Sequence, residues 1–125
     1  MRYTVAISLL LALASSLAGC DPIWVRQSFV EVAPESFPSC VASALNQAGL
    51  KATLLTDSDG KKRLAALYLT GALNVTAKNS SSTHRQVVEL RLIGRGYRPS
   101  NEIEPKLGEG MGNVTVAIAK SCANG

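Results

Sequence analysis

The sequence predicts an α+β fold, with a small antiparallel sheet of three to four strands and two helices on one face. Three observations predict it. Residues 36–48 carry apolar side chains at helical spacing. Residues 86–94 alternate apolar and polar side chains, which is typical of a strand with one buried face. The helical patterns lie near the two ends of residues 20–125. This order favours helices segregated from the sheet over a parallel βαβ arrangement.

The first helix is expected over residues 36–48. Ser36 is the expected N-cap, Pro38 stands in the first turn, and Gly49 supplies a left-handed stop. One apolar stripe follows the helical period: Phe37, Cys40, Val41, Ala44, Leu45 and Ala48. The stripe predicts that the Cys40 sulfur faces the core.

Strands are expected between this helix and the C-terminal part. Residues 50–56 form a short strand, and residues 57–60 (Asp-Ser-Asp-Gly) form a turn followed by a solvated basic tip. Residues 64–76 form one long strand with Gly71 as a bulge, although some of its alanines and leucines also suit a helix. Residues 79–83 form a polar loop, and residues 86–94 form the last strand.

The C-terminal part allows two interpretations. Residues 101–109 are expected to be a broken helix or an ordered loop, because Pro105 and several glycines punctuate the region. Beyond them, one set of apolar residues follows helical spacing: Leu107, Met111, Val114, Ile118 and Cys122. Val114, Val116 and Ile118 also alternate as in a strand. The helix is favoured over residues 112–121.

The first nineteen residues have the layout of a secretory signal. Arg2 is the basic n-region, and an apolar h-region follows over residues 5–14, too short for a span that needs about 20 apolar residues. An ordinary cleaved signal peptide and an uncleaved anchor are the alternatives. The segment closes with Leu17-Ala18-Gly19-Cys20, which resembles the lipobox of bacterial lipoproteins.

This resemblance implies a division of the chain. Residues 1–19 are the signal peptide that is removed, residues 20–34 are a lipidated N-terminus and a tether or edge strand, and residues 35–125 are a single small domain. The Cys20 sulfur is expected to carry a diacylglycerol and its amine a fatty acyl chain such as palmitate, which anchors the protein to a membrane. Trp24 is expected either at the bilayer interface or in ordinary packing.

The resemblance also implies a location in the bacterial cell envelope, facing the periplasm. Asp21 follows the anchor and slightly favours the inner membrane, as in enteric bacteria, while the outer membrane stays open. In an oxidising compartment the two remaining cysteines, Cys40 and Cys122, are expected to form a disulfide. Two free buried thiols are the alternative. A metal site is not expected, because His84 is the single histidine.

The mature chain, residues 20–125, offers few candidate catalytic residues. His84 is the single candidate base and stands in a serine-rich loop, where solvent exposure is the simpler interpretation. Two further groups are expected to be solvated: the acidic cluster Glu102, Glu104 and Glu109, and the arginines Arg95 and Arg98 of a glycine-containing turn. The net charge of +4 includes Arg2 and is too mild to indicate a nucleic-acid partner.

The expected function is therefore non-enzymatic. The sequence predicts a tethered periplasmic domain that binds another cell-envelope protein and has no cofactor beyond the covalent lipid. A lipoprotein inhibitor of lysozyme is one alternative, although the serine-glycine-x-x-tyrosine signature of the common family is absent. A carrier of a small ligand in an apolar pocket is another.

Overall fold

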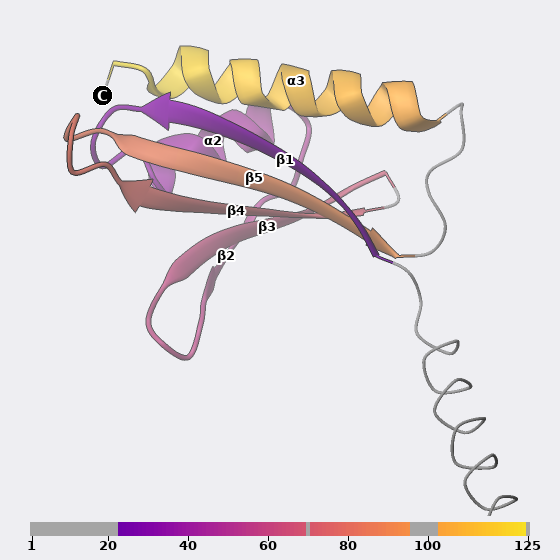
Figure 1. Ribbon diagram of the computed structural model, residues 1–125, viewed down its shortest axis with the longest axis horizontal. Coiled ribbons are helices and arrows are strands. Elements are labelled where there is room, and N and C mark those ends of the chain that lie inside the picture. Colours follow the sequence, from indigo (N-terminus) through magenta and orange to yellow (C-terminus); the bar gives the residue numbers. More distant parts are fainter. Residues whose placement is uncertain (1–22, 70, 96–102, 125) are drawn as a thin grey trace, which may run out of the picture.

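The computed structural model describes residues 23–69, 71–95 and 103–124, which fold into an α+β arrangement as the sequence predicts (Figure 1). Two helices pack on one face of an antiparallel sheet. The elements in chain order are β1 (Ile23–Val32), α2 (Ser39–Gln47), β2 (Thr53–Thr56), β3 (Lys62–Tyr68), β4 (Gly71–Asn79), β5 (Gln86–Arg95) and α3 (Ile103–Cys122). Cys20, the expected site of the lipid, and Asp21 lie outside the described residues.

The sheet has five strands in the order β1-β5-β4-β3-β2, rather than the three or four expected. The expected long strand over residues 64–76 is in fact a hairpin, because β3 ends at Tyr68 and β4 begins at Gly71. Gly71 is not a bulge. It pairs in register with Tyr68 on one side and Gly94 on the other, and a Cβ there would lie 2.9 Å from Leu92 Cδ1.

The segment over residues 23–32 is an edge strand rather than a tether. All ten residues of β1 pair with β5, from Ile23 opposite Arg95 to Val32 opposite Gln86. Trp24 lies on the helix-covered side, buried against Gly94, where a Cβ would stand 2.0 Å from the indole Cζ2. Ordinary packing, and not an interfacial position in a bilayer, therefore accounts for Trp24.

Helix α2 begins later than its sequence pattern predicts. Pro38 is the N-cap residue, and no side chain caps the helix. Ser36 is buried instead, and its hydroxyl donates to the carbonyl oxygen of Ala33 at 2.7 Å. The left-handed stop is confirmed at Gly49, which has φ of 91°. Ala48 is exposed, so the buried stripe of the helix consists of Val41, Ala44 and Leu45.

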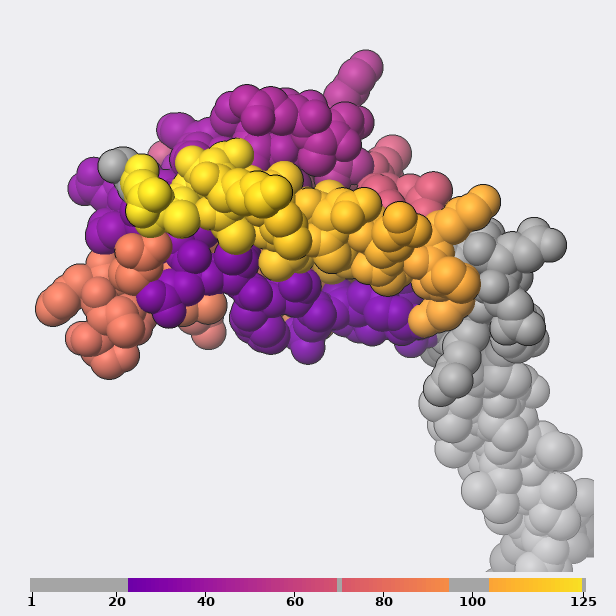
Figure 2. Space-filling model, turned by 90° about the horizontal axis from the view of Figure 1, so that it is seen from above, coloured from indigo at the N-terminus to yellow at the C-terminus, as the bar shows by residue number. Residues whose placement is uncertain are grey.

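Helix α3 is continuous over twenty residues and includes residues 103–109 of the region expected to be a broken helix or an ordered loop. Its apolar stripe is buried as the helical spacing predicts: Leu107, Met111, Val114, Ile118 and Cys122. Val116 is 50% exposed, so the alternative strand interpretation was wrong. Figure 2 shows α3 running along β1, with α2 on its other side.

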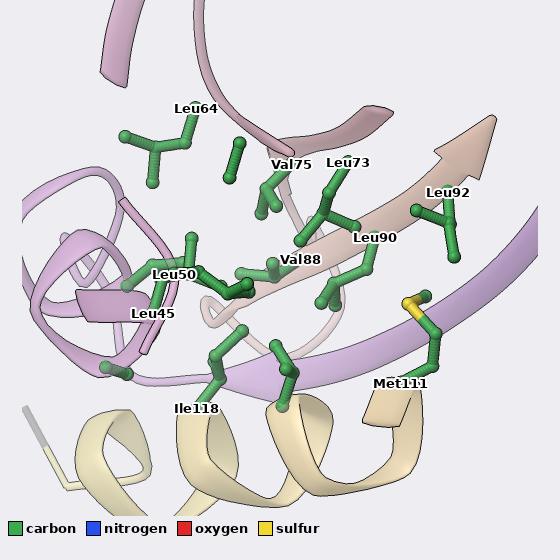
Figure 3. Close-up of a cluster of buried hydrophobic side chains, with 14 of the residues drawn as sticks. Leu45, Leu50, Leu64, Leu73, Val75, Val88, Leu90, Leu92, Met111 and Ile118 are labelled. Atoms are coloured by element: carbon green, nitrogen blue, oxygen red, sulfur yellow. The ribbon is translucent and has the colours of Figure 1, made fainter. Parts of the chain in front are cut away.

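The core fills the space between the helices and the sheet. In Figure 3, Leu90 and Leu92 of β5 and Val75 of β4 point toward Ile118 and Met111 of α3. Leu45 and Leu50 close the same cluster from the α2 side (Figure 3). Every buried side-chain nitrogen or oxygen among the described residues has a hydrogen-bond partner.

A disulfide between Cys40 and Cys122 joins α2 to the end of α3, with 5.9 Å between the Cα atoms. The backbone reinforces this junction, because the Ala33 N–H donates to the carbonyl oxygen of Cys122 at 2.8 Å. The predicted disulfide is therefore present. Of the helices in the described ranges, none combines the length and the apolar composition that crossing a bilayer requires.

Candidate functional site: the uncovered face of the sheet

The face of the sheet opposite the helices is the principal candidate for recognition. Alternation along the strands places Trp24, Val32, Leu90 and their neighbours under the helices and sends the intervening side chains to the other side. No helix of the described residues covers that second side, which we call the outer face. Figure 1 views it with α2 behind the sheet.

One end of the outer face carries a row of apolar side chains. Cross-strand pairing places Val25 beside Ile93, Ile93 beside Ala72, and Ala72 beside Leu67, so the row spans four strands. Leu67 is 83% exposed and Val25 is 38% exposed. We call these four residues the apolar row. We call the end of the sheet that carries it the anchor end, because β1 begins there, three residues after Cys20, the expected lipid anchor.

The middle of the outer face is polar and charged around one aromatic side chain. Phe29 pairs with Glu89 and is 58% exposed. Beside it lies a small hollow, whose lining also includes Lys78 and Val87. Glu31, the next outward residue of β1, forms an ion pair with Arg85 at 3.0 Å. Phe29 is thus an exposed aromatic surrounded by charged groups.

A larger hollow of about 410 Å³ lies where β4 extends past the start of β3. Lys61, Lys62 and Lys78 line it together with Asp57 and Phe37. Arg63 is the last of the three consecutive basic residues 61–63, which we call the basic run, and it does not line the hollow. It forms an ion pair with Asp57 at 3.1 Å and donates to Asn74 Oδ1 at 2.7 Å. The basic run therefore contributes two lysines to this hollow.

The structure does not bring the considered catalytic residues together. His84 is exposed in the loop after β4 with φ of 56°. Glu104 forms an ion pair with Arg26, and Glu109 is exposed on α3. Glu102 and Arg98 lie outside the described residues. Within residues 23–69, 71–95 and 103–124, no three His, Cys, Asp or Glu side chains are grouped as ligands for a metal ion.

Sequence reasoning missed Phe29, Leu67 and Leu69 as functional candidates. The alternation of β1 contained a signal, because Trp24 and Val32 lie on one side of the strand and Phe29 on the other. Leu67 gave no such signal, because the boundary between β3 and β4 was not recognised.

Comparison with known proteins gives no identification. No family model matches the chain, and no curated protein is significantly similar to it.

Proposed function

We propose that this chain is a lipid-anchored periplasmic lipoprotein whose domain binds another protein of the cell envelope through the outer face, centred on Phe29. The single observation that carries the proposal is the exposure of Phe29 on an uncovered sheet face. A phenyl ring is costly to leave in water, and aromatic anchors ringed by polar residues are typical of protein interfaces. The lipobox-like segment ending at Cys20 supports the anchoring.

The surroundings of Phe29 supply the polar rim of such an interface. Glu89, Glu31 and Lys78 offer charges of both signs; Glu31 and Lys78 are exposed, and Glu89 is partly buried. Rim charges steer a partner and fix its register, while the buried ring contributes most of the affinity. The proposal is non-catalytic, as the sequence predicts.

Site-specific photo-crosslinking in intact cells tests this proposal. A photoreactive residue at position 29 is expected to give a covalent adduct of one defined mass. The same residue at position 116, on the exposed side of α3, is the matched control and is expected to give none. A Cys20→Ala variant tests whether the adduct requires the anchor.

Three results would contradict the proposal. Equal adducts at positions 29 and 116 would indicate random collisions. No adduct at either position would indicate that no partner contacts the outer face at Phe29. A Phe29→Ser variant that keeps its melting temperature and still recovers the same complex would show that the partner binds elsewhere.

A second candidate function is the binding of a small anionic ligand in the hollow beside Lys62. Its volume of about 410 Å³ falls in the range of ligand pockets, and three lysines face one aspartate around it. Inorganic phosphate and succinate are suitable first probes. Stabilisation by either probe that disappears in a Lys62→Ala, Lys78→Ala variant would favour this function. No change in melting temperature with either probe would argue against it.

A further inference from the structure

We propose that the anchor end of the outer face rests on the bilayer, so that the apolar row and Leu69 contact lipid and fix the orientation of the domain. This inference rests on the proposed lipid anchor at Cys20 and goes beyond it. An acylated cysteine alone would tether the domain without orienting it. The occupant that we assign to the apolar row is the surface of the membrane that holds the lipid.

The distribution of apolar side chains is the first argument. The apolar row and the neighbouring Ile23, which is 65% exposed, place five apolar residues together at one end of the sheet. The next row along the strands is mainly polar, with Gln27, Arg91 and Asn74 followed by Ala65. A surface that is apolar at one edge and polar about 7 Å behind it suits a bilayer interface, which changes polarity over a short depth.

Leu69 is the second argument. Tyr68 pairs with Gly71, so Leu69 belongs to the connection between β3 and β4, at the anchor end. It has φ of 51° and is 58% exposed. Glycine or asparagine is the usual choice for a left-handed connection, and a leucine there neither relieves the backbone nor buries its side chain. Contact with lipid gives this leucine a role that the fold of the described chain does not.

The position of the anchor is the third argument and selects the occupant. Cys20 precedes Ile23 by three residues, which span at most about 11 Å when extended. A lipid on Cys20 therefore holds the start of β1 within that distance of the bilayer. Four of the large exposed apolar residues of the described chain lie at this same end: Ile23, Val25, Leu67 and Leu69. An interface between two copies of the chain would have no reason to favour the end nearest Cys20.

Spin labels on the lipidated, full-length product in vesicles of phosphatidylethanolamine and phosphatidylglycerol test the inference. With Cys40 and Cys122 bridged and Cys20 acylated, an introduced cysteine is the free thiol for labelling. Leu67→Cys places the label in the apolar row. Phe29→Cys places it on the same face, and both native side chains are exposed, so it is the matched control. Disulfide closure and circular dichroism verify the fold of each variant.

Oxygen is expected to relax the label at position 67 strongly, and a water-soluble nickel chelate is expected to relax it weakly. The ratio of the oxygen effect to the nickel effect is expected to be at least three times larger at position 67 than at position 29. A label at position 67 as open to nickel as the one at position 29 would overturn the inference. Shielding from both reagents, with spin–spin broadening that grows with protein density, would overturn it in favour of a second copy.

Mass spectrometry of the N-terminal peptide separates this inference from the anchoring on which it rests. An unmodified Cys20 would overturn both. An acylated Cys20 with a water-exposed label at position 67 would overturn the orientation alone.

A Leu69→Asn variant adds a readout that a structural role would not give. Asparagine suits the left-handed backbone, so the melting temperature is expected to stay the same or rise. Contact with the bilayer is expected to weaken nonetheless, seen as a drop in the oxygen-to-nickel ratio of the label at position 67. A ratio unchanged by this substitution would remove Leu69 from the contact.

Discussion

Gly110 of helix α3 lies against the side chain of Tyr68, whereas Gly112 faces open space. Replacing each of these glycines by alanine is therefore expected to change the free energy of unfolding differently. A Cβ built on Gly110 would lie 1.5 Å from the Tyr68 hydroxyl oxygen and 2.4 Å from its Cζ. A Cβ on Gly112 would meet nothing within 4 Å. Both glycines lie inside α3, so replacement by alanine gives the same gain in helix propensity at each position.

The magnitudes follow from this difference. Alanine in place of an open helical glycine stabilises by roughly 0.8 to 1 kcal/mol, which is the expectation for Gly112→Ala. Gly110→Ala gains the same amount but displaces the Tyr68 ring, and overpacking of this kind costs about 1 to 3 kcal/mol. We therefore expect Gly110→Ala to be neutral or destabilising, and the two variants to differ by about 1 to 3 kcal/mol.

Urea unfolding followed by far-ultraviolet circular dichroism measures both variants. Gly108→Ala, also in open space, is a second control and is expected to behave like Gly112→Ala. In a Tyr68→Ala background the obstruction is gone, so Gly110→Ala is expected to stabilise as the controls do. Equal stabilisation by Gly110→Ala and Gly112→Ala with Tyr68 intact would refute the reasoning.

Three further predictions concern the junction of the helices and the anchor end. Replacing Cys40 and Cys122 by alanine is expected to lower the free energy of unfolding by about 4 kcal/mol, because the bridge closes a loop over a sequence separation of 82; urea unfolding checks this, and a loss below about 1 kcal/mol would contradict it. Ser36→Ala is expected to lower the free energy of unfolding by only about 0.5 to 1.5 kcal/mol, since the Ala33 and Cys122 carbonyls each keep a backbone hydrogen bond. A loss above about 3 kcal/mol in the same assay would contradict this prediction. Leu69→Asn is expected to raise the free energy of unfolding by about 1 kcal/mol, because a left-handed φ costs most residues about 1 to 2 kcal/mol; a lower urea midpoint would argue against that strain.

Much of the fold could be predicted because apolar spacing is a local signal. The buried stripe of α3 and the alternation of β5 are visible in the sequence, and both are confirmed. The glycines of α3 misled the prediction, and at Gly110 the structural reason for a glycine is not local. Gly110 accommodates Tyr68, which is 42 positions away in the chain and arrives only through the sheet.

The boundary between β3 and β4 could not be predicted for a related reason. The turn before Lys61 contains the residues that a hairpin favours, and it was recognised. The connection through Leu69 contains a leucine in the left-handed region, which local turn chemistry does not anticipate. The sequence pattern therefore predicted one strand over residues 64–76. The apolar row was therefore hidden, because Leu67 and Ala72 become neighbours only once the chain reverses between them.

If the domain sits on the bilayer as proposed, the register that places the apolar row at the anchor end also sets the height of Phe29 above the membrane. Phe29 lies four positions after Val25 in β1, which amounts to about 13 Å along an extended strand. With the apolar row on the bilayer, Phe29 would stand beyond it in the aqueous layer, on the same outer face. The two exposed features then act on different partners, since the row orients the domain and the ring remains open to a neighbouring protein. A domain tethered only through Cys20 would present Phe29 in all directions, whereas one seated on the apolar row presents it at a fixed height and loses less rotational freedom on binding.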